Sequence, residues 1–92
     1  MLRNFQIETK SITDIQIPDP KDINGHYMAF VLIEDYSIFA VNLLSEVVVG
    51  HFRPTIMMCD SSLSLDLHSS MRYMMETTKG GYIILWKLNE NF

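Results

Sequence analysis

Cys59 is the residue best suited to covalent chemistry, because it is the single cysteine and it precedes Asp60 at the expected start of a helix. A thiol at a helix N-terminus ionises more readily and can act as a nucleophile. The candidate bases are the three histidines, His26, His51 and His68. The alternative is that Cys59 is a small buried side chain beside Met57 and Met58. No family signature surrounds the cysteine, so we predict no catalytic residue here.

The same side chains do not show the spacing of a metal site. Cys59 and the histidines are separated by eight or more residues, without a Cys-x-x-Cys or His-x-x-x-His pattern. Two acidic pairs, Glu34 with Asp35 and Asp19 with Asp22, are close enough in sequence for acid–base chemistry. Both pairs lie in predicted turns, where aspartate is common. We therefore predict no metal site and no catalytic pair of carboxylates.

Motifs built on glycine are also missing. The chain has four glycines, and none has the spacing of a phosphate-binding or dinucleotide-binding loop. The segment Asp60-Ser61-Ser62 follows an expected strand, but it lacks the glycines and the βα framework of a nucleophile elbow. The sequence therefore predicts a protein that is not an enzyme and that binds no cofactor.

The charge distribution narrows the class of partner. The net charge is −4, from 11 acidic and seven basic residues. The basic residues are scattered and form no stripe that would neutralise a run of phosphates, so direct nucleic-acid binding is disfavoured. The acidic residues are mildly concentrated in the first 35 positions, which leaves an acidic nucleic-acid mimic as one alternative.

The cysteine count and the apolar windows indicate the compartment. One cysteine allows no intrachain disulfide, which fits a reducing environment. The N-terminus has no apolar core of signal-peptide length. The best apolar window, 27–49, contains Glu34, Asp35 and Glu46, so it does not predict a membrane span. We expect a cytoplasmic protein without membrane contact, in the host cytoplasm if the source is viral.

Residues 26–52 carry the strongest signal of secondary structure. Apolar runs at 27–33, 38–44 and 47–49 are separated by short polar breaks, and their β-branched and aromatic content favours strands over a buried helix. They predict the centre of an antiparallel meander, with its third strand over 47–52. Because the first two runs are apolar at both parities, both of their faces need cover.

Shorter strands are expected on either side of this meander. Alternating apolar residues predict strands over 4–9 and 12–17, and Pro18 and Pro20 end regular structure after them. Residues 55–59 predict a further short strand or an extended segment that leads into a helix. These segments supply edges and cover for the central strands.

The segment 61–79 fits two periodicities. The residues at helical spacing are Leu63, Leu67, Met71, Met74 and Met75. The letters SLSLDL, however, alternate leucine with polar residues, as is typical of a strand. We predict a helix over 62–79 that ends at Gly80-Gly81, with a strand over 62–68 and a short following helix as the alternative.

A last strand over 82–88 completes the expected fold. The sequence predicts one α+β domain over 1–92, mainly an antiparallel sheet of four to six strands with the helix 62–79 packed on one face. One helix covers one face of the sheet and not both. The other face of the central strands could be covered by curling of the sheet, by the N-terminal strands or by a second protein. We interpret this second face as evidence for contact with another protein, either a host complex or a second copy of the chain.

Aromatic, methionine and charged residues near the predicted strand ends supply the candidate contacts. Methionine adapts to varied binding faces, and Tyr, Trp and Arg are typical anchors of protein interfaces. The predicted partner-binding residues are Glu34, Asp35, Tyr36, Arg72, Tyr73, Met74, Tyr82 and Trp86. For the methionines and Trp86 the alternative is core packing.

These features favour a small non-enzymatic protein-binding module that acts by steric contact. A compact, acidic domain without motifs is typical of phage and mobile-element accessory proteins that inhibit a host protein complex, anti-defence proteins among them. Two alternatives stay open at this point. One is a structural subunit of a homo-oligomer, such as a homodimer, and the other is the acidic nucleic-acid mimic.

Overall fold

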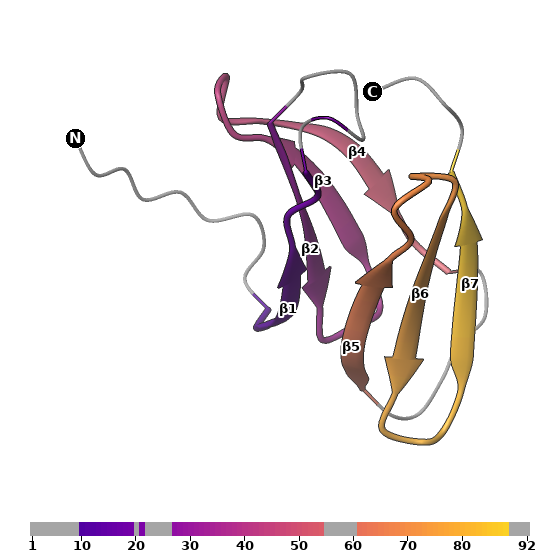
Figure 1. Ribbon diagram of the computed structural model, residues 1–92. Helices are drawn as coiled ribbons and strands as arrows, with labels where there is room; N and C mark the ends of the chain where they lie inside the picture. Colours follow the sequence, from indigo (N-terminus) through magenta and orange to yellow (C-terminus); the bar gives the residue numbers. More distant parts are fainter. Residues whose placement is uncertain (1–9, 20, 22–26, 55–60, 89–92) are drawn as a thin grey trace.

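The computed structural model shows an all-β chain with two antiparallel sheets (Figure 1). It describes residues 10–19, 21, 27–54 and 61–88. The described strands are β1 (Ile12–Gln16), β2 (Met28–Ile33), β3 (Ile38–Asn42), β4 (Val47–Phe52), β5 (Ser62–Leu67), β6 (Tyr73–Thr78) and β7 (Ile83–Lys87). Strands β1 to β4 form sheet A and strands β5 to β7 form sheet B, each in chain order. The strands predicted over 4–9 and 55–59 lie outside the described residues.

The predicted α+β class is wrong, because no helix forms over 62–79. That segment holds β5 and β6, which pair as an antiparallel hairpin. Met71 lies in the turn between them at φ 59, a left-handed conformation that a continuous right-handed helix excludes. The segment SLSLDL forms a strand, as its alternating pattern indicates, and not the helix that the spacing of its leucines and methionines suggested. Pairing with β6 buries Leu65 and leaves Asp66 exposed. The alternative strand over 62–68 is close to β5, but the short helix expected after it is replaced by β6.

Sheet A is a meander whose two central strands are buried. Every position of β2 is buried, as are four of the five positions of β3. This agrees with the prediction from their apolar runs. The turn between them places Tyr36 at φ 72, and the Ile33 N–H donates to the Ser37 carbonyl at 2.8 Å across its base.

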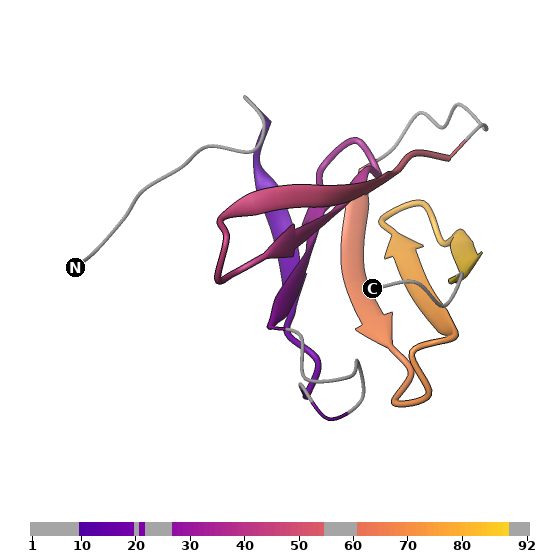
Figure 2. The ribbon, with the colours of Figure 1, turned by 90° about the horizontal axis from the view of Figure 1, so that it is seen from above.

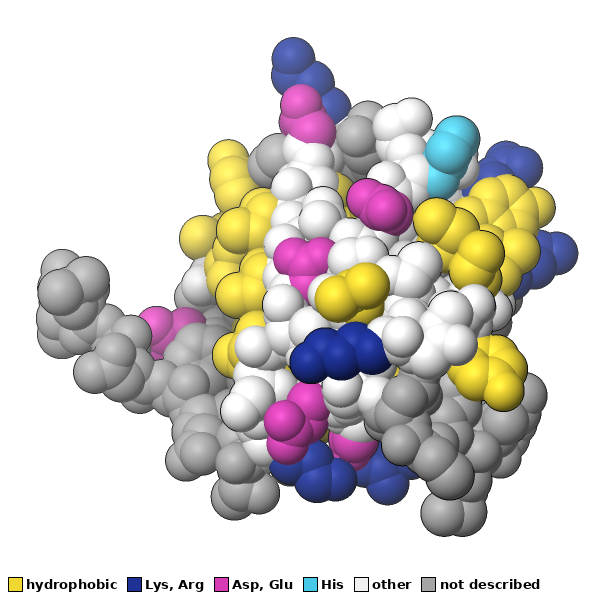
Figure 3. Space-filling model, turned by 90° about the horizontal axis from the view of Figure 1, so that it is seen from below, with side chains coloured by type: hydrophobic (Ala, Val, Ile, Leu, Met, Phe, Trp, Pro, Cys, Tyr) yellow, Lys and Arg dark blue, Asp and Glu magenta, His cyan; other side chains and the backbone are white. Residues whose placement is uncertain are grey.

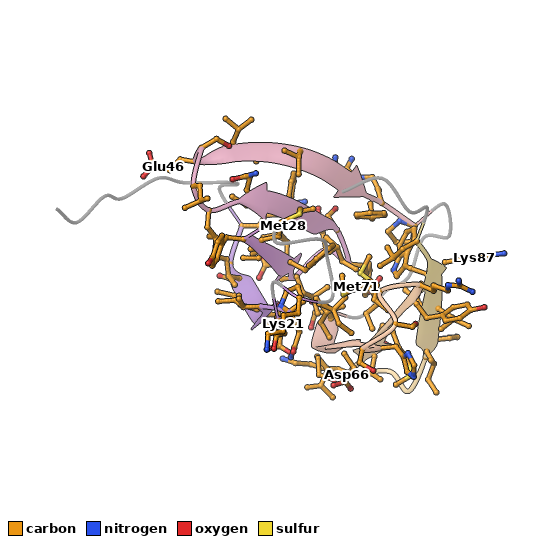
Figure 4. All side chains as sticks on the ribbon, turned by 45° about the horizontal axis from the view of Figure 1, so that its top comes forward. Lys21, Met28, Glu46, Asp66, Met71 and Lys87 are labelled. Atoms are coloured by element: carbon orange, nitrogen blue, oxygen red, sulfur yellow. The ribbon has the colours of Figure 1, made fainter. Side chains whose placement is uncertain are left out.

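The inner faces of the two sheets pack on each other and form the main core. Its buried members are Met28, Phe30, Leu32, Ile38, Ala40, Leu65, Met71, Met74 and Leu88. Figure 4 shows Met28 and Met71 in the space between the sheets. Burial of a large apolar side chain contributes about 1.5–3 kcal/mol, so this cluster is the main source of stability.

Strands β1 and β5 join the two sheets along one side through side-chain hydrogen bonds. The Leu65 N–H of β5 donates to Asp14 Oδ2 of β1 at 2.8 Å. Ser62 Oγ donates to the Ile33 carbonyl at 2.7 Å and lies 3.0 Å from Thr13 Oγ1. The edges of β1 and β5 therefore face each other.

The sheets also meet at a second place, where β4 ends near β7. The rings of Phe52 and Trp86 make an edge-to-face contact there, with their centroids 5.8 Å apart. Both side chains pack against the main core. Beyond this contact β4 and β7 are the outer strands of their sheets (Figures 1 and 2).

A second buried cluster lies on the other face of sheet A. Its members are Ala29, Val31, Ile33, Phe39 and Val41, and the most exposed of them, Phe39, retains 9% of its accessible surface. The ring of His51 stacks on Phe39 with the centroids 4.2 Å apart. Both faces of the central strands are thus buried within a single chain. Cover by a second protein is not needed for these residues.

Candidate functional site

Three of the predicted contact residues lie together in the turn between β2 and β3. Glu34 is exposed, Asp35 is partly buried, and Tyr36 is buried with 7% of its surface accessible. The turn is therefore only partly available to a partner.

Asp35 is held in this turn by internal interactions. Its Oδ2 accepts a hydrogen bond from Lys10 Nζ at 2.9 Å and lies 4.0 Å from Arg53 Nη2. Its Oδ1 accepts from the Ser37 N–H at 3.1 Å. Burial alone would raise the pKa of the Asp35 carboxyl, but the hydrogen bonds from Lys10 and Ser37 together lower it below its usual value. These contacts stabilise the turn and account for Asp35 without a partner.

The other predicted contact residues lie on or beside β6 and β7, and they divide between two faces. Met74 is buried in the main core, and Trp86 faces the same interior. Tyr73 and Tyr82 are exposed by 43% and 60%. Arg72, just before β6, is also exposed. The structure thus brings Tyr73 and Arg72 to the surface and uses Met74 and Trp86 mainly for packing.

Glu76 is a buried acid that the sequence did not single out. It lies on the inner face of β6, opposite Leu65 and Ile84, with none of its surface accessible. Trp86 Nε1 donates to Glu76 Oε1 at 3.3 Å, whereas Glu76 Oε2 has no hydrogen-bond partner among the described residues. Burial raises the pKa of this carboxyl to about 7, against a smaller opposing effect of the Trp86 hydrogen bond. The negative charge of Asp35 contributes a smaller part of this rise.

Glu76 has no partners suited to catalysis in the described part of the chain. No group of three or more His, Cys, Asp or Glu side chains that would hold a metal ion occurs among the described residues. His51 is used in the stack on Phe39, and His68 Nδ1 lies 2.8 Å from Ser70 Oγ in the turn after β5. Cys59 and His26 are outside the described residues. Glu76 is thus a titratable group of the core.

The outer face of sheet B carries a set of neighbouring apolar side chains that the strand register brings together. Met75 pairs with Leu85, and Tyr73 pairs with Lys87, two residues along the same two strands and therefore on the same face. Two residues in the other direction, Thr77 pairs with Ile83. Ile83, Leu85 and Tyr73 are exposed by 67%, 66% and 43%. We call Tyr73, Met75, Ile83 and Leu85 the outer apolar face.

Charged and polar residues border the outer apolar face. Asp66 lies beside Met75 on β5, and Lys87 lies beside Tyr73 on β7. Both side chains point to the periphery of the molecule (Figure 4). From below, hydrophobic side chains gather on the sheet A side and, separately, on the sheet B side (Figure 3). An apolar centre with a charged border is the composition expected of a protein-binding surface.

The chain matches no protein-family model, and no curated protein is similar to it in sequence. Over the ranges that the structure describes, no helix has the length and apolar character to cross a membrane.

Proposed function

We propose that this protein is a non-enzymatic binding module that contacts another protein through the outer apolar face of sheet B. The observation that carries the proposal is the exposure of Ile83, Leu85 and Tyr73 on neighbouring, register-matched positions of one sheet face. The main core lies on the opposite side of the same strands, so these side chains are not needed to hold the sheets together. Contiguous apolar patches of this kind mark interaction sites in soluble proteins.

The partner class that fits this surface is a folded protein with an apolar patch of its own. The outer apolar face is bordered by one acidic and one basic side chain, Asp66 and Lys87, and carries no cluster of either sign. Contact would therefore depend on apolar burial more than on charge, with weak dependence on salt. The more specific role, inhibition of a host complex by a phage or mobile-element protein, remains part of this proposal.

The acidic-mimic alternative has less support from the described residues. It needs the acidic side chains of the first 35 residues on one face. Asp14 instead accepts a hydrogen bond from Leu65 N–H, and Asp35 pairs with Lys10, so both are engaged inside the molecule. Glu8 and Asp22 lie outside the described residues.

Affinity purification from the native cell tests the proposal with two matched variants. Met75→Glu places a charge in the middle of the outer apolar face, and Leu44→Glu places one on a 76% exposed leucine in the turn between β3 and β4. We expect the wild type and Leu44→Glu to retain one partner in a fixed ratio. Met75→Glu should lose it while keeping its β-type circular dichroism. A bound protein that Met75→Glu retains as well as the wild type would show that the outer apolar face is not the contact.

A further inference from the structure

The outer edge of β7 is the second notable feature of sheet B, because none of the described strands pairs with it. The Leu88 N–H donates to the Arg72 carbonyl at 2.7 Å, and the Thr78 N–H donates to the Tyr82 carbonyl at 3.0 Å. Hydrogen-bonded and non-bonded pairs alternate along an antiparallel ladder. The backbone N–H and C=O groups of the alternate residues therefore point away from β6. These residues are Ile83, Leu85 and Lys87.

The other strand edges in the described structure are protected in recognisable ways. The edges of β1 and β5 face each other across the Asp14–Leu65 hydrogen bond. In β4 the register with β3 shifts, so that Gly50 pairs with Ala40 and Val48 with Val41. Such a bulge interrupts the even spacing of outward N–H and C=O groups and hinders further pairing. By contrast, β7 pairs with β6 without a shift and presents a regular edge.

We propose that β7 pairs antiparallel with β7 of a second copy of this chain, about a two-fold axis at Leu85. In this arrangement Leu85 faces Leu85 of the second copy, and Ile83 faces Lys87. The residues whose backbone N–H and C=O groups point away from β6 are then opposite the same kind of residue in the second copy. An antiparallel ladder requires this alignment for hydrogen bonds to form. The two copies of sheet B become one six-stranded sheet, a two-fold arrangement in which the same patch serves both molecules.

The charge and apolar pattern of β7 favours this register. Lys87 is the single charged residue of the strand. With the axis at Leu85, the two Lys87 residues are separated by four residues along the strand, or about 13 Å, which exceeds the range of unscreened repulsion in physiological salt. An axis at Lys87 would place the two ammonium groups opposite each other. The axis at Leu85 also aligns the full length of both strands and places an apolar pair at the centre.

The exposure of β7 agrees with an edge that another strand covers. Ile83 and Leu85 are exposed by 67% and 66%, and even the inward-facing Ile84 and Trp86 are only partly buried. Pairing brings Ile84 of one copy opposite Trp86 of the other, next to the core. The dimer uses the backbone edge of β7, so this inference does not depend on the proposed function. The outer apolar face would continue across both copies and stay available to another protein.

Charge exchange at position 85 provides the decisive test. Sedimentation equilibrium of the full chain should give a dimer at about 100 μM protein, and Leu85→Lys and Leu85→Glu should each weaken dimerisation about tenfold or more, because like charges would face each other. An equimolar mixture of the two variants should restore the dimer as a heterodimer. Leu63→Lys, which changes a 52% exposed leucine of β5, is the matched control and should leave the dimer intact.

Cysteine crosslinking tests the register independently. In a Cys59→Ser background, Leu85→Cys should form an intermolecular disulfide, because the Cα atoms of a hydrogen-bonded antiparallel pair are about 5.5 Å apart. Ile83→Cys should not crosslink to itself, but it should crosslink to Lys87→Cys when the two variants are mixed. A wild-type monomer at 100 μM would overturn the proposal. So would a dimer that Leu85→Lys and Leu63→Lys affect equally, or efficient crosslinking of Ile83→Cys alone.

Discussion

The buried carboxyl of Glu76 should make the stability of this protein fall as the pH rises towards neutrality. Burial raises the pKa of Glu76 from 4.5 to about 7 in the folded state. Between these two values the folded chain holds a proton that the unfolded chain has released. Folding is then linked to proton uptake, so the free energy of unfolding decreases with increasing pH. Below pH 4.5 both states are protonated and the loss is absent.

The size of the effect follows from the shift. One pKa unit corresponds to 1.36 kcal/mol, so a change from 4.5 to about 7 removes about 3 kcal/mol from the free energy of unfolding once the pH exceeds 7. This is a large share of the about 5–15 kcal/mol that holds a small domain together. No hydrogen bond to Glu76 Oε2 offsets the cost of the buried charge within the described residues.

Glu76→Gln isolates this contribution. Glutamine keeps an oxygen that can accept a hydrogen bond from Trp86 Nε1. Its side chain is neutral, and its NH₂ group takes the place of the O–H of the protonated acid. Urea unfolding of wild type and variant should give similar free energies near pH 5. At pH 8 the variant should be more stable by about 3 kcal/mol, the linkage free energy given above. Asp35 has the opposite effect, because its lowered pKa makes the fold less stable in acid. Since both proteins contain Asp35, its contribution cancels when the free energy of unfolding of one is subtracted from that of the other.

The single tryptophan supplies a direct readout of the same group. Trp86 donates to Glu76 and is the sole tryptophan of the chain, so its fluorescence should titrate near pH 7 in the wild type and lose this transition in Glu76→Gln. Asp66→Asn, on the exposed side of β5, controls for the change of net charge. If the stability difference between wild type and Glu76→Gln is constant from pH 5 to pH 8, the assignment of Glu76 as a buried titrating group is wrong.

Two further predictions concern the hydrogen bonds and turns that shape the fold. Asp14→Ala should lower the free energy of unfolding by about 1–3 kcal/mol in urea, because the buried Leu65 N–H loses its acceptor, whereas Asp14→Asn should retain most of the stability. An effect of Asp14→Ala no larger than that of Asp66→Ala would show that the bond between β1 and β5 is dispensable. Gly81→Ala should lower the melting temperature at a cost of about 1 kcal/mol, because Gly81 has φ 87 and a Cβ there meets no atom within 4 Å, so that the whole cost is backbone strain. Gly81→Asn should cost less, and equal costs for the two variants would argue against this explanation.

Sequence periodicity identified the described strands of sheet A and also β7, which the strand predicted over 82–88 matches, but it did not identify the hairpin of β5 and β6. The apolar runs over 27–33 and 38–44 had one consistent interpretation, because β-branched and aromatic residues at both parities fit a strand that is covered on both faces. Over 62–79 the helical spacing of leucines and methionines competed with an alternating pattern. Tertiary pairing decided between them, since the turn at Met71 lets β5 and β6 cover the inner face of sheet A. Spacing within one segment does not contain that information.

The surface residues were harder to assign, because the aromatic side of β7 is its inner side. Alternation separated Trp86 from Ile83 and Leu85 correctly, but the size of Trp86 favoured it as an anchor over its smaller neighbours. Its indole N–H instead finds an acceptor in Glu76, inside the sandwich. Glu76 itself could be found only after β6 was recognised as a strand, where it shares the inward parity of Met74. An acid at an inward position of a strand is the signal that would reveal such a group.

The strand edges of the described structure support the proposal that this protein acts by contact with another molecule. A sheet edge with free N–H and C=O groups is a hazard, and proteins usually close, bulge or charge it. In this chain, the edges of β1 and β5 close on each other and β4 carries a bulge. The edge of β7 has no bulge in its pairing with β6 and a single charge, Lys87, at one end. The edges of β1, β5 and β4 are thus protected, whereas the edge of β7 is regular and mostly apolar. This difference favours the proposal that another strand covers the edge of β7 when the protein functions.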